Sequence, residues 1–160
     1  MPLAVVHGDI TKMEVDAIVN AANNQLVDGG GLNGAVRSAA GYGLTKACRE
    51  LGFCKTGDAK ITDGFRLPSK YLIQTVGPRW TGGNSGEEEL LKSCYRKSLE
   101  LALQYKCHTI AFPLISSGNY GYPKEDALQL AKNAILKWLE EHKNMTVYLI
   151  LYDKSEFEGV

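Results

Sequence analysis

Three consecutive glycines, Gly29, Gly30 and Gly31, are the residues of this chain whose type and spacing most directly suggest chemistry. Glycine has no Cβ, so such a run can turn several backbone N–H groups toward one point, an arrangement that binds anions and most often phosphate. An apolar run at residues 17–19 precedes the glycines, and a renewed apolar pattern begins at Leu32. This order predicts a strand, a turn and a helix whose positive end strengthens anion binding. A flexible connection explains the same glycines equally well, so this loop alone leaves both interpretations open.

A second loop with the same features lies at residues 116–123, which read S-S-G-N-Y-G-Y-P. It follows an apolar run at residues 109–115 and leads into a helical pattern that Pro123 suits as a first position. In α/β sheets, loops that leave strands and enter helices meet at the carboxyl ends of the strands, where ligands bind. Two phosphate-competent loops at one edge of a sheet predict a ligand that carries a diphosphate.

The rest of the chain supplies the elements that must position these loops. Strands alternate with helical patterns, which predicts an α/β domain with a largely parallel sheet covered on both faces. Gly41 and Gly43 are expected to break one helical stretch into two pieces, and Ser85 with Glu88 fits a capping box at the start of the next helix. The expected strands are residues 3–7, 16–22, a short strand within 56–66, 71–76, 109–115 and 145–152. The expected helical stretches are residues 32–51, a helix from the capping box at Ser85 to about residue 105, and residues 123–139.

Composition excludes several classes of protein. The chain has 160 residues, of which 44% are hydrophobic, and we expect one domain over residues 1–160. Its 18 basic and 18 acidic side chains leave no basic excess for a nucleic-acid partner, and no apolar segment is long enough for a membrane. The four cysteines, at irregular spacings and without a secretory signal, indicate reduced thiols in a cytoplasmic protein. We expect no metal, no cofactor and a monomer.

Several short motifs, taken together, resemble the macrodomain family. They are G-D-I-T at residues 8–11, V-N-A-A-N at 19–23, G-G-G at 29–31, T-V-G-P at 75–78 and I-S-S-G-N-Y-G-Y-P at 115–123. The branch that they look most like includes the O-acetyl-ADP-ribose deacetylases and the mono-ADP-ribosyl hydrolases. The resemblance implies a three-layer α/β/α fold with a mixed, largely parallel sheet of six or seven strands, and ADP-ribose lying across the strand ends.

On the family pattern, Asp9 would accept a hydrogen bond from the adenine amino group, which only donates. Ile10 would line the same pocket, and Tyr152 would stack on the adenine, although it also suits an ordinary position at the edge of the core. The two glycine-rich loops would hold the diphosphate, Asn23 would orient the distal ribose, and Tyr120 would pack against that sugar. The ligand-binding residues implied in this way are Asp9, Ile10, Asn20, Ala22, Gly29, Gly30, Gly31, Leu32, Ser116, Ser117, Gly118, Asn119, Tyr120 and Tyr152.

Two positions depart from the family pattern. The hydrolase branch usually has an aspartate where this chain has Asn33, and that aspartate is thought to position or deprotonate the attacking water. An amide can hold a water but cannot act as a general base at neutral pH. Asp28 stands where the family often has a first glycine, and a diphosphate would repel it, so we expect it to point to solvent or to cap the turn. The alternative, that Asp28 replaces the missing acid, requires it to act across a bent loop.

The sequence leaves three hypotheses about function. The first is an enzyme that binds ADP-ribose and hydrolyses ADP-ribosyl esters (mono-ADP-ribosylated acidic side chains or O-acetyl-ADP-ribose) at the distal ribose. In this enzyme Asn23 would fix the sugar. Asn33 would hold a water that the ligand's own diphosphate orients or activates. The second is a reader module that binds ADP-ribose or ADP-ribosylated protein with little catalysis, because Asn33 replaces the acid. The third is a nucleotide-sugar or RNA phosphate-binding protein, unrelated to ADP-ribose, that does not distinguish ADP-ribose from ADP.

Overall fold

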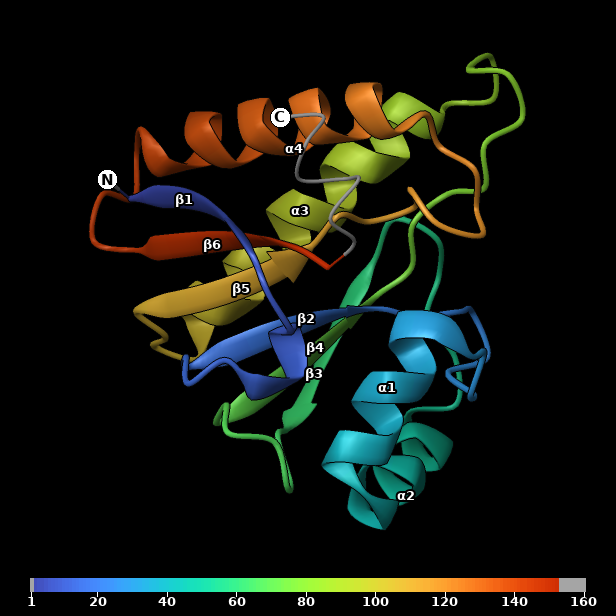
Figure 1. Cartoon of the computed structure of the whole chain (residues 1–160), viewed down its shortest axis with the longest axis vertical. Helices are drawn as coiled ribbons and strands as arrows, with labels where there is room; N and C mark the ends of the chain where they lie inside the picture. The colour runs from blue at the N-terminus through green and yellow to red at the C-terminus, as the bar shows by residue number, and fades with distance from the viewer. Residues whose placement is uncertain (1, 153–160) are drawn as a thin grey trace.

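The computed structural model describes residues 2–152, in which six strands and four α-helices follow one another along the chain (Figure 1). Every strand and helix expected from the sequence is present, with ends that differ by a few residues. The elements are β1 (Leu3–His7), the 3₁₀ helix η1 (Ile10–Lys12), β2 (Ala17–Ala21), α1 (Gly31–Ala40), α2 (Tyr42–Leu51), β3 (Ala59–Asp63), β4 (Tyr71–Thr75), α3 (Glu87–Gln104), β5 (Thr109–Pro113), α4 (Lys124–Leu139) and β6 (Thr146–Leu151).

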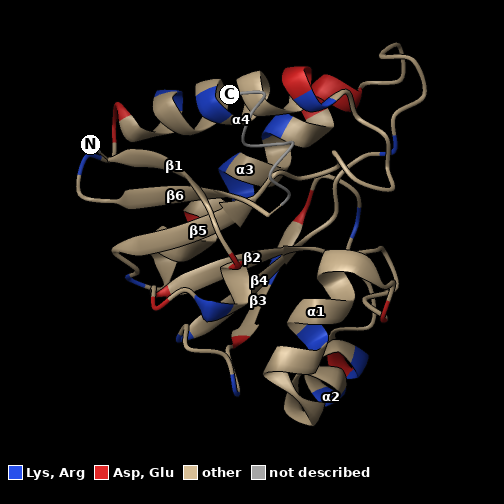
Figure 2. Ribbon diagram, viewed as in Figure 1, with Lys and Arg blue, Asp and Glu red and all other residues tan. Residues whose placement is uncertain are grey.

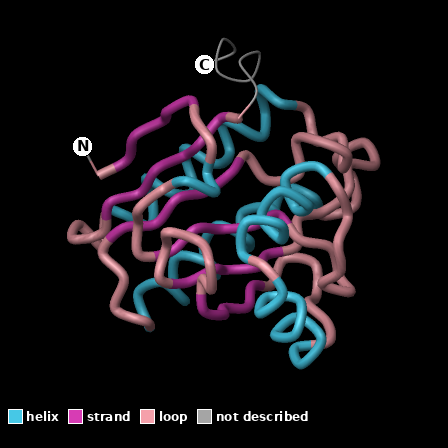
Figure 3. Tube along the Cα trace, turned by 60° about the horizontal axis from the view of Figure 1, so that its bottom comes forward, coloured by secondary structure: helices cyan, strands magenta, loops and turns pink. Residues whose placement is uncertain are grey.

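The six strands form one sheet in the order β1-β6-β5-β2-β4-β3. Neighbouring strands from β1 to β4 run parallel, and only β3 is antiparallel, paired with β4. The predicted mixed, largely parallel sheet is therefore confirmed, with six strands. Because the five parallel strands share one direction, their carboxyl ends lie at one edge of the sheet. The loops that follow β2, β4 and β5 gather on this side of the molecule (Figures 1 and 3).

Helices cover both faces of the sheet, so the predicted three-layer α/β/α fold is also confirmed. Helices α3 and α4 pack on one face and α1 and α2 on the other, each pair with its own hydrophobic cluster (Figure 1). Neighbouring residues of β2 divide between these clusters, Val19 with α3 and α4 and Ile18 with α1 and α2. Successive side chains of a strand point to opposite faces, so a strand buried on both faces is apolar throughout.

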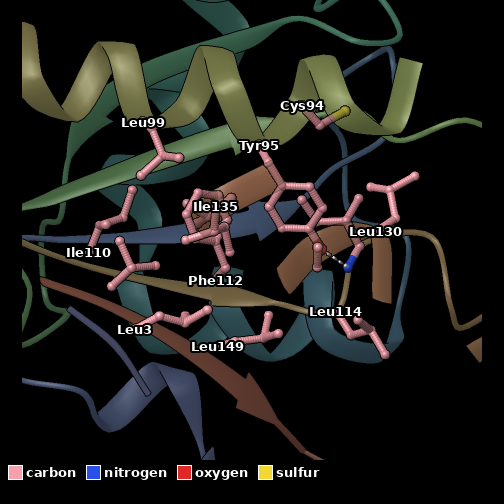
Figure 4. Close-up of a cluster of buried hydrophobic side chains, with 14 of the residues drawn as sticks. Leu3, Cys94, Tyr95, Leu99, Ile110, Phe112, Leu114, Leu130, Ile135 and Leu149 are labelled. Carbon is pink, nitrogen blue, oxygen red and sulfur yellow. Dashed lines mark hydrogen bonds between the residues drawn. The ribbon is translucent and has the colours of Figure 1, made fainter. Parts of the chain in front are cut away.

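A buried tyrosine connects α3 to the end of β5 (Figure 4). The ring centroid of Tyr95 lies 5.0 Å from that of Phe112. Its hydroxyl accepts a hydrogen bond from the backbone N–H of Ile115 at 3.1 Å and donates to the carbonyl of Pro113 at 3.4 Å. Burial raises the pKa of Tyr95 well above its ordinary value, so the hydroxyl keeps its proton. The start of the second glycine-rich loop is thus anchored from inside the core.

The expected break in the first helical stretch occurs at Gly41 but not at Gly43. Gly41 has φ 89° and separates α1 from α2, because a positive φ is a conformation that glycine adopts at little cost. Gly43 lies inside α2, where a Cβ would come within 2.6 Å of the Phe65 ring. Its role is close packing, so the prediction that it breaks the helix was wrong.

The predicted capping box at the start of α3 was also wrong. The N-cap is Gly86, with φ 79° and no side-chain cap, so Ser85 lies one residue too early to serve. The side chain of Glu87 instead turns back onto the preceding loop. Its carboxylate accepts hydrogen bonds from the backbone N–H groups of Thr81 (2.9 Å), Gly83 (2.9 Å) and Ser85 (2.6 Å). These hydrogen bonds, of which the one from Thr81 has the largest effect, lower the pKa of Glu87 from 4.5 to about 2.

We predict that Glu87 stabilises the fold in a pH-dependent way. A lowered pKa means that the folded state favours the carboxylate, so the stabilisation is complete above pH 4.5 and is lost as the pH falls toward 2. Wild type should therefore exceed Glu87→Gln in free energy of unfolding at neutral pH, and this difference should shrink through that acid range. Urea unfolding at a series of pH values measures it, with Glu88→Gln, an exposed neighbour, as the control. A difference between wild type and Glu87→Gln that does not change with pH would contradict the assignment.

Candidate functional site

A cavity of about 820 Å³ lies at the carboxyl edge of the sheet. It is formed by the segments that follow β1, β2, β4, β5 and β6, and by the first turn of α1. The structure brings nearly all of the sequence-predicted site residues to its wall, namely Asp9, Ile10, Ala22, Asn23, Gly29, Gly30, Gly31, Leu32, Asn33, Ser116, Ser117, Gly118, Asn119, Tyr120 and Tyr152. The exception is Asn20, which is completely buried beneath the cavity and does not line it.

The order of the strands arranges the site residues in a row along the cavity. Asp9 follows β1, residues 116–120 follow β5, Asn23 follows β2, and Arg79 follows β4. Neighbouring strands lie about 4.8 Å apart, so the four steps from β1 to β4 span roughly 19 Å. The cavity therefore suits an elongated ligand that crosses the strand ends.

At the β1 end, Asp9 has one carboxylate oxygen engaged and one available. Its Oδ1 accepts hydrogen bonds from the backbone N–H of Thr11 at 2.9 Å and from the Thr11 hydroxyl at 2.7 Å, which caps η1. Its Oδ2 accepts no hydrogen bond from the part of the chain that the structure describes, so it can take a donor from a ligand. Ile10 is buried beside it, and Tyr152, which is 65% exposed, completes this end of the cavity.

The first glycine-rich loop presents the start of α1 to the cavity. Within residues 2–152, no acceptor is bonded to the backbone N–H groups of Gly31, Leu32 and Asn33, as is usual in a first helical turn. The Asp28 carboxylate accepts a hydrogen bond from the backbone N–H of Gly30 at 3.0 Å. The prediction that Asp28 caps the turn is therefore confirmed, and one N–H group of the loop is already occupied by this carboxylate.

The second loop offers a further set of donors. Among the described residues, the backbone N–H groups of residues 117–120 have no acceptor. Ser116 adopts φ 67° and faces Gly77, where a Cβ would collide with its hydroxyl. The Ser116 hydroxyl is buried without a partner in the described structure, whereas the Ser117 hydroxyl donates to the Leu114 carbonyl at 3.0 Å. Unpartnered donors on two facing loops form a site for an anion.

Three asparagines hold the first loop in shape. The side-chain amides of Asn23 and Asn33 both donate to the backbone carbonyl of Val27, at 2.8 and 2.9 Å. The Val27 N–H in turn donates to Oδ1 of Asn23 at 3.0 Å. Asn20 donates from below to Oδ1 of Asn33 at 2.7 Å and to Oε1 of Gln74 at 2.8 Å. We call the bonds of Asn23 and Asn33 to Val27 the Val27 clasp.

This network fixes which way the Asn33 amide points. Both hydrogens of the Asn20 amide are used, so the oxygen of Asn33 faces inward and its nitrogen faces Val27. Asn33 is only 8% exposed and lines the cavity. One amide hydrogen and one oxygen lone pair remain for a water or a ligand.

Sequence reasoning missed Gly77 and Arg79, which also line the cavity. The guanidinium carbon of Arg79 lies 4.4 Å from the centroid of the Tyr120 ring. The backbone N–H of Trp80 donates to the Tyr120 carbonyl at 2.7 Å and joins the two loops. The T-V-G-P motif, which ends directly before Arg79, was the signal that this segment belongs to the site.

Other kinds of site find no support in the described chain. No group of three or more His, Cys, Asp or Glu side chains is placed to hold a metal among residues 2–152, and no helix there is long and apolar enough to cross a membrane. All four cysteines are buried and unpaired, and burial raises the pKa of Cys54, Cys94 and Cys107 to about 11. Lysines, arginines and acidic residues occur together on the helices and loops (Figure 2).

Comparisons with known proteins agree on one family. The family model described as "Macro domain" matches residues 19–131. A macro domain-containing protein of Methanosarcina mazei is 54% identical over 159 residues, covering 99% of this chain and 85% of that protein. The rat ADP-ribose glycohydrolase MACROD1 is 49% identical over 93% of this chain, which spans 58% of that relative. The Oceanobacillus iheyensis macrodomain with ADP has a TM-score of 0.94 and 43% identity, covering 98% of this chain and 86% of the solved one.

The Val27 clasp predicts that Asn33→Asp destabilises the protein. A carboxylate cannot donate to the Val27 carbonyl and would place an oxygen against it, so the free energy of unfolding should fall by about 1–3 kcal/mol. Urea unfolding measures the change. Asn119→Asp is the matched control, because Asn119 is exposed and its side chain makes no hydrogen bond in the described structure; it should change stability by less than about 0.5 kcal/mol. Equal stability of Asn33→Asp and wild type would show that the bond from Asn33 to Val27 contributes nothing.

Proposed function

This chain belongs to the macrodomain family, and from that premise we propose that it binds ADP-ribose and slowly hydrolyses ADP-ribosyl esters at the distal ribose. One observation carries the proposal: two loops that line one cavity carry backbone N–H groups without an acceptor in the described structure, and an Asp9 carboxylate oxygen without a hydrogen-bond donor lies at the β1 end. A diphosphate fits the loops, and the adenine amino group fits Asp9. Support from relatives comes from the rat protein, named an ADP-ribose glycohydrolase, and from the solved macrodomain that holds ADP.

Binding follows from the chemistry of each part of the cavity. The loop N–H groups donate to the diphosphate oxygens, and the positive end of α1 adds to this attraction. The buried Ser116 hydroxyl supplies a further donor without first losing a protein partner. At the β1 end, Oδ2 of Asp9 accepts from the adenine amino group while Tyr152 stacks on the ring. At the other end, Asn23 and Tyr120 adjoin the distal ribose.

Hydrolysis requires a positioned water, since no side-chain base is placed at position 33. In the proposed reaction the diphosphate orients a water against the ester and takes up its proton. The water oxygen bonds to the carbonyl carbon of the ester, and the bond from that carbon to the ribose oxygen breaks. The proton held by the diphosphate passes to this ribose oxygen, so that ADP-ribose and a free carboxylic acid leave. Holding the reactants in this geometry lowers the barrier by several kcal/mol without a general base. The esters that ADP-ribose forms with acidic side chains, and O-acetyl-ADP-ribose, are both substrates of this type.

A second candidate function, that of a reader, is favoured by the state of Asn33. Its amide is tied to Val27 and Asn20, and an amide is not a base at neutral pH. The same residues then bind ADP-ribosylated protein and release it unchanged. Hydrolysis and reading use identical binding contacts, so only turnover separates them.

We predict that Asp9→Asn weakens ADP-ribose binding by about tenfold or more, because an amide nitrogen replaces the acceptor Oδ2 and loses a charged hydrogen bond. Since asparagine keeps an oxygen for Thr11, the η1 cap and the melting temperature should change little. Calorimetry with ADP-ribose and with its hypoxanthine analogue, which lacks the amino group, tests the assignment. If Asp9→Asn does not reduce the preference for adenine over hypoxanthine, Asp9 does not read the base. Equal affinity of the wild type for ADP and ADP-ribose would support the third hypothesis.

We predict that wild-type protein releases ADP-ribose from a glutamate-linked mono-ADP-ribosylated protein, and that Asn33→Asp raises this rate by about 10²–10⁴-fold. Aspartate at position 33 loses the bond to Val27, which loosens the first loop. The variant should therefore be assayed alone and also together with Asp28→Gly, a second change that frees the Gly30 N–H for the diphosphate. Mass spectrometry measures release against a protein-free blank.

The control is the intact mass of the wild type, because the pair Asn33-Gly34 is of the type that deamidates, which would itself produce an acid. Tight ADP-ribose binding without release by the wild type would identify the reader.

A further inference from the structure

Arg79 has a distinct place in the charge pattern of the cavity. Among the described residues that line it, Asp9 is the one acid and Arg79 the one base. Asp9 follows β1 and Arg79 follows β4, so the two residues lie at opposite ends of the cavity. A ligand with adenine at Asp9 passes the diphosphate loops after β5 and β2 before it reaches Arg79. Arg79 therefore lies beyond the distal ribose, where an ADP-ribosylated protein would continue into its own polypeptide.

The guanidinium of Arg79 makes a cation–π contact with Tyr120. Its central carbon lies 4.4 Å from the centroid of the Tyr120 ring, and the bond from Trp80 N–H to the Tyr120 carbonyl joins the two loops. Gly77 packs against Ser116 at the base of the same loop. A cation–π contact does not consume hydrogen-bond donors, so the N–H groups of the guanidinium remain for a carboxylate.

Those donors have no anionic partner in the part of the chain that the structure describes. Within residues 2–152 the ion pairs are Lys92 with Glu89 and Lys97 with Asp58, and neither involves Arg79. The proposed diphosphate contacts do not require Arg79 either, because both loops carry backbone N–H groups without an acceptor in the described structure. An oriented cation with free donors at the polypeptide end of the site fits an anion outside ADP-ribose itself.

We propose that Arg79 is a specificity residue that binds a carboxylate next to the modified side chain, so that ADP-ribosylated segments rich in Asp and Glu are the preferred protein ligands. The inference rests on the proposed binding of ADP-ribose and extends it to the polypeptide. A planar, bidentate pair between guanidinium and carboxylate gives this recognition both charge and geometry. O-acetyl-ADP-ribose carries no such carboxylate and gains nothing from Arg79.

The test compares three ligands by calorimetry: free ADP-ribose, a peptide that carries ADP-ribose through a non-hydrolysable linkage and is flanked by glutamates, and the same peptide flanked by glutamines. Wild type should bind the glutamate peptide about tenfold more tightly than the glutamine peptide, and less so at high salt. Arg79→Gln should reduce this preference to less than about twofold and should lower the affinity for free ADP-ribose far less than the affinity for the glutamate peptide. Arg79→Lys should keep part of the preference, since it retains the charge but not the planar fork.

The matched control is Arg96→Gln, which removes an exposed cation of α3 outside the cavity and should leave all three affinities unchanged. Melting temperatures establish that each variant is folded. Equal wild-type affinity for the two peptides, with ADP-ribose binding intact, would overturn this inference alone. An equal loss of free ADP-ribose affinity in Arg79→Gln would also overturn it, by assigning Arg79 to the diphosphate. Failure of the wild type to bind ADP-ribose at all would overturn the proposed function as well.

Discussion

Burial of the sheet on both faces is the constraint on which the rest of this structure depends. The four inner strands, β6, β5, β2 and β4, carry apolar side chains toward both helical layers, and the two hydrophobic clusters leave them little room for polar groups. Polar chemistry is therefore confined to the strand ends, where the backbone leaves the sheet. Parallel order then gathers five such ends at one edge. The cavity is a consequence of this arrangement, because the loops that close over the edge cannot also fill it.

Backbone groups and amides, rather than ionised side chains, shape the centre of the site. Within residues 2–152, the charged residues on its wall are Asp9 and Arg79, at the two ends. Between them, the loops contribute N–H groups, and the asparagines contribute bonds that hold the first loop. Asn20, Asn33 and Gln74 form a chain of neutral hydrogen bonds beneath the cavity. A neutral floor of this kind does not repel a diphosphate, and it also provides no base, so the affinity and the slow chemistry proposed for this site have one origin.

The sequence predicted the fold and most of the cavity wall because those features are local or periodic. Apolar runs without alternation indicated strands buried on both faces, and glycine runs after strands indicated the loops. The errors concern features that depend on distant contacts. Gly43 allows the Phe65 ring to pack closely against α2. Glu87 turns back onto a loop whose course cannot be predicted from a local sequence pattern. Asn20 belongs to a motif that faces the site, yet strand geometry turns its side chain into the interior. Arg79 was missed because its stacking on Tyr120 joins two segments far apart in the chain.

The bond between Tyr95 and Ile115 also fixes the start of the second loop in the folded protein, with no ligand bound. Since the tyrosine belongs to the core beneath β5, the loop takes its shape as the core packs, and the loss of conformational entropy accompanies folding. A ligand that arrives later meets donors already in position and loses little affinity to ordering them. Preorganisation of this kind links two properties that are usually studied apart: a core substitution beneath the loop alters the thermodynamics of recognition at the surface without touching the ligand.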